Sequence, residues 1–189
     1  MSKAVLISIR PKWCQKIASG EKTIEVRKNR PKLAPPFKCY IYCTREKHLA
    51  FMQNQTGTNL ISCLDAETAI PVGGFVGNGK VIGEFTCDRI YKIDKDSVDF
   101  IFTCDHGGYP VYKKAAEECC GLCVAMPDNE LFDYLEHRQG YGWHISNLKI
   151  YDTPKALEEF TGLRDTKFGA APYEIKRAPQ SWCYVEETK

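Results

Sequence analysis

The sequence predicts an α+β fold, in which a small β-barrel or curled sheet is surrounded by short helices and insertions. Short apolar runs typical of buried strands recur along the 189 residues. Apolar residues at helical spacing appear only in brief stretches, and strands do not alternate regularly with helices. A chain of this length suits one domain. We therefore expect residues 1–189 to form a single domain, with insertions at about 44–79 and 94–126.

The first 27 residues predict a strand, a short helix and a second strand. AVLISI (4–9) is apolar enough for a buried strand, and Pro11 then favours the start of a helix. Gly20 follows the helical stripe where a left-handed cap is expected. TIEVR (23–27) has the alternation of a strand.

Later segments predict further strands and helices. Strands are expected at 38–43, 80–93, 141–152 and 180–187. Helices are expected around 112–119, at 127–137 with Asp128 as N-cap, and at 153–160 with Thr153 as N-cap. The stretch 44–79 predicts a long loop or a hairpin arm.

Positive charge is concentrated near the N-terminus. Residues 10–32 hold eight Lys or Arg and two Glu, a net charge of 8 − 2 = +6, whereas the whole chain carries +2. The rest of the chain therefore carries 2 − 6 = −4. A local basic patch suits an anionic ligand such as phosphate or nucleic acid, although a solvated basic face would look the same.

Lys22, Glu25 and Arg27 lie within the seven positions after Gly20. The pleat places Glu25 and Arg27 on the face opposite the apolar pair of the strand, and Lys22 precedes them at the helix cap. We expect all three side chains to line one polar cleft open to solvent, with Arg10 and Lys12 beside them.

The pattern G-x-K-x-x-E-x-R formed by Gly20, Lys22, Glu25 and Arg27 resembles the signature of the ASCH domain, of bacterial or phage type, in the PUA-like superfamily. The segments LISIRPKWCQKIASGEKTIEVR, GKVIGEF, GYGWHIS and PQSWCYV are similar to ASCH proteins as well. The resemblance implies a small PUA-like barrel with a cleft beside the first helix, and a function in binding RNA.

One bacterial branch of the family hydrolyses N4-acetylcytidine. There the motif lysine is implied to act as nucleophile or base, with a threonine three residues later. Here Lys22 matches the lysine, but Glu25 occupies the position of the threonine. This departure weakens the assignment as an amidohydrolase.

The chemistry of Lys22 separates binding from catalysis. A free lysine has a pKa of about 10.4 and is no base near neutrality. Arg27, Arg10, Lys12 or burial would lower that pKa, whereas Glu25 would stabilise the ammonium. We therefore favour a charged Lys22 that binds an anion, over a catalytic pair formed by Lys22 and Glu25.

Two other interpretations stay open. Lys22, Glu25 and Arg27 could form an ion network that only joins the helix to the strand. The chain could also be a protein-interaction module whose insertions dock a partner. Its oligomeric state is not indicated by the sequence.

Trp143 lies in GYGWH between glycine-flanked positions, so it is predicted either to stack on a base or to pack in the core. His144 is more typical of a satisfied histidine than of a catalyst. No G-x-S-x-G or P-loop pattern is present. We expect no cofactor.

The ten cysteines are predicted to be reduced. The opening MSKAVLISIRPK lacks a long apolar core, so we expect no signal peptide, a cytoplasmic location and no membrane association. CCGLC (119–123), with Cys104 and His106 upstream, offers only one well-spaced ligand pair for zinc. No metal site is therefore predicted.

Overall fold

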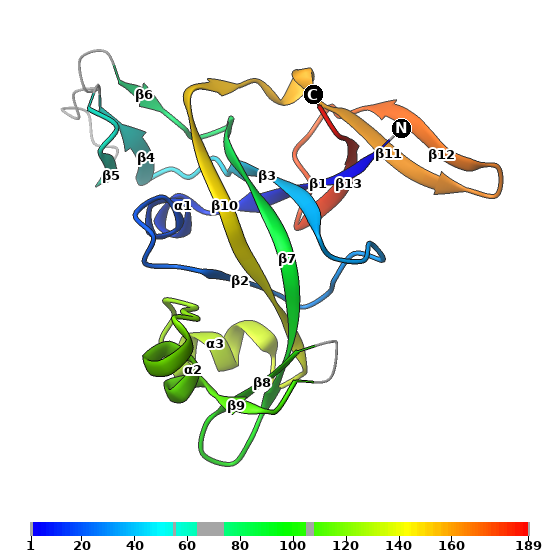
Figure 1. Ribbon diagram of the computed structural model, residues 1–189. Helices are drawn as coiled ribbons and strands as arrows, with labels where there is room; N and C mark the ends of the chain where they lie inside the picture. The colour runs from blue at the N-terminus through cyan, green and yellow to red at the C-terminus, as the bar shows by residue number, and fades with distance from the viewer. Residues whose placement is uncertain (1, 55, 64–73, 105–107, 189) are drawn as a thin grey trace. The chain divides into compact units, whose positions relative to one another are not determined.

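The computed structural model describes residues 2–54, 56–63, 74–104 and 108–188. The chain divides into two compact units. Unit 1 comprises residues 1–19, 38–85 and 148–189, and unit 2 comprises residues 20–37 and 86–147. The boundaries between the units at 85/86 and 147/148 fall inside two long strands, β7 (Val81–Lys95) and β10 (Gly140–Lys155) (Figure 1).

Unit 1 is built on a sheet with the strand order β12-β11-β13-β1-β3, followed by the first part of β7 and the last part of β10. The new strands are β1 (Lys3–Ile9), β3 (Phe37–Cys43), β11 (Thr161–Thr166), β12 (Gly169–Glu174) and β13 (Trp182–Glu186). β1 runs parallel to β3 and antiparallel to β13. Every residue of β1 after Lys3 is buried, so both faces of the strand are covered, which agrees with its nearly continuous apolar run.

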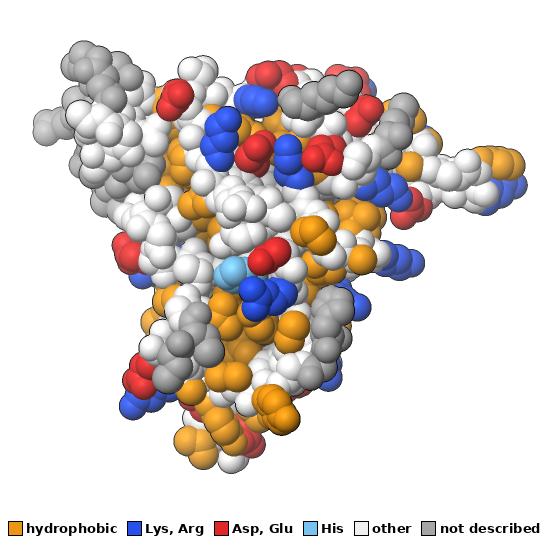
Figure 2. Space-filling model, viewed as in Figure 1, with side chains coloured by type: hydrophobic (Ala, Val, Ile, Leu, Met, Phe, Trp, Pro, Cys, Tyr) orange, Lys and Arg blue, Asp and Glu red, His pale blue; other side chains and the backbone are white. Residues whose placement is uncertain are grey.

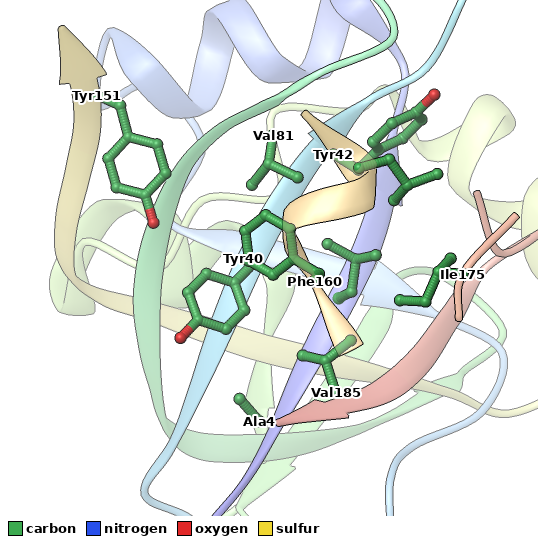
Figure 3. Packing of buried hydrophobic residues seen from close by; sticks show 10 residues of the cluster. Ala4, Tyr40, Tyr42, Val81, Tyr151, Phe160, Ile175 and Val185 are labelled. Carbon is green, nitrogen blue, oxygen red and sulfur yellow. The ribbon is translucent and has the colours of Figure 1, made fainter. Parts of the chain in front are cut away.

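The core of unit 1 collects side chains from most of these strands. Tyr40 and Phe160 meet edge to face with ring centroids 4.9 Å apart. Figure 3 shows these rings among Val81, Ile175 and Val185. Alternate residues of each strand point inward, so strands distant in the sequence share one apolar cluster.

A second, three-stranded sheet of unit 1 occupies the predicted insertion at 44–79. It consists of β4 (Leu49–Gln53), β5 (Asn59–Cys63) and β6 (Phe75–Val76) in the order β5-β4-β6. Helix α1 (Pro11–Ala18) contacts β4 and β5. The hairpin that the sequence suggested within 44–79 is therefore present at β4 and β5. Residues 64–73 of the insertion lie outside the described residues.

Unit 2 combines the strands β2 (Ile24–Arg27), β8 (Phe100–Cys104) and β9 (Val111–Tyr112) with the helices α2 (Lys113–Cys120) and α3 (Asp128–Leu135). β2 pairs with β10, and β8 pairs with both β7 and β9. Ile24 and Val26 form a core with Ile93, Val124 and Leu131. The apolar face predicted for TIEVR is thus the core face of β2.

Two local predictions were wrong. Asp128 is the first residue of α3 rather than its N-cap, which is Pro127, and the Asp128 carboxylate pairs with Lys113. The helix expected at 153–160 is only a 3-10 turn, Leu157–Glu159, because β10 continues to Lys155. The turn places Leu157 and Phe160 in the core of unit 1, which a spacing of three residues allows.

The hairpin β11–β12 and the strands β8 and β9 were not predicted from the sequence, because their residues show no clear alternation of apolar and polar side chains. The fold is mostly sheet with a few short helices, in line with the α+β prediction. The described strands do not close into a barrel within either unit.

Figure 2 shows one face of the protein, on which acidic and basic side chains are interspersed. No helix in the described part of the chain is long and apolar enough to cross a membrane. Of the described cysteines that are free thiols, Cys14, Cys39, Cys43 and Cys87 are buried, as expected of small apolar residues in a core.

Candidate functional site

The motif residues are placed by the turn between α1 and β2. Gly20 has φ +80°, a left-handed conformation that glycine adopts without a steric penalty, and it ends the helix as predicted. Lys22 follows in the turn, and Glu25 and Arg27 lie in β2. The short spacing therefore delivers three charged side chains to one end of unit 2.

One edge of β2 is covered by the segment 121–124. The backbone N–H groups of Thr23 and Ile24 both donate to the Cys123 carbonyl oxygen, at 2.9 and 3.0 Å. The Thr23 hydroxyl donates to the Gly121 carbonyl oxygen at 2.9 Å and accepts from the Cys123 N–H at 2.7 Å. β10 occupies the other edge, and all four residues of β2 are buried.

The three charged side chains form one buried ion cluster, here called the motif cluster (Lys22, Glu25 and Arg27). The Arg27 guanidinium lies 2.9 Å from Glu25 Oε1, and Lys22 Nζ lies 3.6 Å from Glu25 Oε2. Lys22 Nζ also donates to the Val124 carbonyl oxygen at 2.7 Å. Only 2%, 6% and 7% of the surfaces of Lys22, Glu25 and Arg27 are exposed. The expectation that these groups face an open cleft is wrong.

Burial changes the electrostatics of the cluster. It lowers the pKa of Lys22, and Arg27 acts in the same direction, whereas Glu25 opposes both. The pKa of Lys22 is therefore lower than that of a free lysine, because desolvation outweighs the nearby carboxylate. Burial also raises the pKa of Tyr134, whose side chain is hydrogen-bonded to Arg27.

Trp143 is fully buried, so in this structure its ring is not available to stack on a base. It lies opposite Glu25 in the β2–β10 ladder, and directly opposed residues share one face of a sheet. Its ring meets Phe37 edge to face at 5.9 Å. The indole therefore belongs to the packing around the motif cluster.

Arg10 and Lys12 belong to unit 1, whereas the motif cluster belongs to unit 2. Both side chains are exposed, with Arg10 at the N-cap of α1 and Lys12 Nζ 4.5 Å from the centre of the Trp13 ring. That they join the motif residues around one ligand stays a prediction.

Three exposed cations of unit 2 lie just beyond β2. Lys28, Arg30 and Lys32 are all exposed, and we call them the basic loop. The Arg30 guanidinium lies 5.8 Å from the centre of the half-buried Tyr141 ring. Lys28 lies 5.6 Å from the Tyr134 ring and pairs with Glu136. Cations and aromatic rings are thus presented side by side on this surface.

Several partners of the motif cluster could not be predicted from the sequence. The Val124 carbonyl and the Tyr134 hydroxyl come from about a hundred residues along the chain, and neither has a local sequence pattern. A second buried lysine, Lys113, donates to the Met126 carbonyl oxygen at 2.9 Å and pairs with Asp128. This lysine ties the far end of the 121–126 segment to α2.

His144 is a satisfied histidine, as expected. Its Nδ1 lies 2.6 Å from Asp88 Oδ1, and the pair joins β10 to β7 within unit 2. Nearby, the Ser146 hydroxyl donates to the Thr86 carbonyl oxygen at 2.8 Å. Burial raises the pKa of the Cys87 thiol to about 12, so this cysteine is not an activated nucleophile.

The described residues contain no group of three or more His, Cys, Asp or Glu side chains that could hold a metal ion. His106 and the side chains of Cys119 and Cys120, which the sequence suggested as ligands, lie outside the described residues. The residue Cys123 of the same motif contacts the backbone N–H of Ala125 through its sulfur, at 3.2 Å.

Comparison with known proteins bears on the same segment. The model of the ASCH domain matches residues 7–94. The chain is similar to the solved structure of ASCH from Zymomonas mobilis, with 16% identity, 97% of this chain and 88% of that chain covered, and a TM-score of 0.48. A mutant of ZmASCH from the same organism gives 16% identity, coverage of 98% and 92%, and a TM-score of 0.49. No curated protein matches the chain.

Proposed function

We propose that this chain, whose residues 7–94 match the model of the ASCH domain, binds RNA or a related nucleotide ligand. The observation that carries the proposal is the basic loop, where Lys28, Arg30 and Lys32 are exposed beside the Tyr141 ring. Binders of single-stranded nucleic acid combine positive charge along the backbone with aromatic side chains that accept stacked bases.

The proposal divides the work between buried and exposed residues. The motif cluster holds β2 in place from within, and the chain leaves β2 directly into the basic loop. Phosphates would then bind the loop side chains, with Arg10 and Lys12 as further candidates from unit 1. We also propose that the fold is a variant of the PUA-like barrel that the motif suggested.

A titration of single-stranded RNA against salt tests this function. Each phosphate contact on a single strand contributes about 0.7 to the slope of log K against log salt. The double variant Arg30→Ala/Lys32→Ala is expected to lose affinity and to reduce the slope by roughly 1.4. Lys114→Ala is the matched control, because this lysine is 80% exposed on α2 of the same unit. Binding by the wild type that neither salt nor the double variant changes would exclude the basic loop.

One observation favours a second candidate, hydrolysis of a modified nucleoside such as N4-acetylcytidine. Burial lowers the pKa of Lys22, and a neutral amine can act as nucleophile or base. Because Lys22 is 2% exposed and bonded to the Val124 carbonyl, a substrate would reach it only if the segment 121–126 moves aside.

Release of cytidine from N4-acetylcytidine at high protein concentration tests this second candidate. Turnover that is abolished in Lys22→Met and rises with pH through the pKa of the lysine would support it. Absence of turnover in the folded wild type would exclude N4-acetylcytidine as a substrate. The protein-interaction hypothesis rests on the insertions, and residues 64–73 of these lie outside the described residues.

A further inference from the structure

The hairpin β11–β12 of unit 1 extends beyond the strands that support it. Its ladder runs from Thr161 opposite Glu174 to Thr166 opposite Gly169. Among the described residues, β13 pairs with β11 only at Gly162 and Leu163. Figure 1 shows the rest of the ribbon projecting past β13. We call residues 164–171 the hairpin arm.

The arm has no core of its own. Every side chain from Arg164 to Ala170 is exposed, and Ala171 is partly exposed. An isolated two-stranded ribbon is only marginally stable in water, since it buries little apolar surface. Packing therefore gives no reason for its length, whereas contact with another molecule would.

The tip of the arm presents one aromatic ring in a fixed turn. Phe168 is 90% exposed, and Lys167 Nζ lies 5.0 Å from the centre of its ring. The Thr166 hydroxyl donates to the Gly169 carbonyl oxygen at 2.7 Å and accepts from the Phe168 N–H at 3.2 Å. These bonds order the turn, so the turn loses less conformational entropy when a ligand stacks on the ring.

One face of the hairpin carries a second cation in the arm and, next to the core of unit 1, a second ring. Arg164 lies opposite Ala171, and Tyr173 follows Ala171 on the same face. The Tyr173 ring lies directly over Gly162, where an added Cβ would stand 2.3 Å from the ring carbon Cζ. Only glycine leaves room for the ring there. The face thus runs from Tyr173 past Arg164 towards the Lys167–Phe168 tip.

The charge of the hairpin region favours an anionic partner over a cationic one. Four cations are exposed in or just after the hairpin, namely Arg164, Lys167, Lys176 and Arg177. The hairpin has two acids, and one of them, Asp165, is paired with Lys3. Residues 161–177 therefore carry a net charge of 4 − 2 = +2, and single rings next to cations are the elements that hold bases and phosphates.

Addition of a strand from another protein fits this edge poorly. β12 is the last strand of its sheet, and a free edge is a template for pairing. However, Pro172 lies in the middle of β12 and has no backbone N–H to donate. Contacts are therefore made by side chains of the arm rather than by its backbone.

We propose that the hairpin arm contacts single-stranded nucleic acid, with a base stacked on Phe168 and adjacent phosphates bound by Arg164 and Lys167. The proposal adds a second contact to the RNA binding proposed above and rests on it. The arm is distinct from the basic loop, which belongs to unit 2.

The test uses the full chain and a single-stranded RNA oligonucleotide that carries 2-aminopurine, whose fluorescence falls when an aromatic ring stacks on it. Loss of one stacked base is worth about 1–3 kcal/mol, so Phe168→Ala is expected to weaken binding roughly five- to a hundredfold and to remove quenching. Tyr109→Ala is the matched control, because Tyr109 is a 93% exposed aromatic residue outside the arm. Phe168 makes little core contact, so both variants should keep the melting temperature of the wild type.

The outcomes separate this inference from the proposed function. If the wild type binds RNA, the basic-loop variant weakens binding and Phe168→Ala behaves like Tyr109→Ala, the arm proposal is overturned while RNA binding stands. If the wild type binds no single-stranded RNA at low salt, both proposals are overturned. A weaker complex for Arg164→Ala with a reduced salt slope, together with lost quenching for Phe168→Ala, supports the arm.

Discussion

Residues 22–27 and residues 28–32 both contain Lys and Arg, but these side chains lie in opposite environments. The motif cluster is buried, and its charges are matched to one another and to the Val124 carbonyl. The basic loop is exposed, and its cations face solvent and aromatic rings. The difference shows that the packing around a charge, rather than its type, decides whether it is buried in the fold or exposed to solvent.

The largest contrast is expected on removal of the shared carboxylate. Glu25→Gln leaves the buried guanidinium of Arg27 without a counter-charge, so the free energy of unfolding should fall by about 3–5 kcal/mol, measured by urea denaturation. Glu118→Gln is the control, because this carboxylate is 62% exposed and pairs with Lys114 at 3.8 Å. Its loss should change stability by less than about 0.5 kcal/mol. Equal effects of the two variants would contradict the assignment of a buried cluster.

The buried lysine should make stability depend on pH. The pKa of Lys22 is lower in the folded protein than in the unfolded chain, so the unfolded state holds the extra proton between the two values. Stability should therefore rise with pH in the window from the lowered pKa up to about 10.4, the ordinary lysine value.

This pH effect is measured as the difference in unfolding free energy between the wild type and Lys22→Met across pH 7 to about 10.5. Subtracting the variant removes the contributions of the tyrosines, which are common to both proteins. The difference should grow in favour of the wild type as pH rises. A flat difference would mean that Lys22 keeps an ordinary pKa in the folded protein.

A smaller effect is expected at the edge of the cluster. Tyr134→Phe removes the hydroxyl that is hydrogen-bonded to Arg27 and retains the ring. Because Glu25 still holds the guanidinium at 2.9 Å, the unfolding free energy should fall by about 1–2 kcal/mol. Tyr112→Phe provides the comparison, since this tyrosine is 51% exposed and its hydroxyl bond to Asp96 is long, at 3.4 Å. A neutral Tyr134→Phe would show that the hydroxyl adds nothing to the cluster.

The basic loop should give the smallest effect on stability. Arg30→Ala/Lys32→Ala removes two exposed charges and is expected to shift the unfolding free energy by less than about 0.5 kcal/mol per site. Thermal and urea unfolding check this expectation alongside the salt titration of RNA binding. A large destabilisation would place these side chains in the folding core of unit 2 and would remove the contrast.

Local chemistry was sufficient to predict much of the first 43 residues. The apolar run of β1, the proline at the start of α1, the glycine after it and the alternation of β2 each act through neighbouring residues, so their positions follow from the sequence. The ASCH resemblance followed from four residues within eight positions, which is also a local property. Elements with weaker alternation, such as β8, β9 and the β11–β12 hairpin, were missed.

The environment of those same residues was decided by tertiary structure. Lys22 is buried because the backbone of residues 121–124 pairs with β2, and Trp143 lies opposite Glu25 because of the register of β10. Both contacts join segments about a hundred residues apart, and no local pattern encodes them. The sequence by itself determined which charges stand near β2. Only the packing of distant segments determined which of these charges lose their water. Loss of water lowers the pKa of Lys22, whereas the side chains of the basic loop remain exposed to solvent.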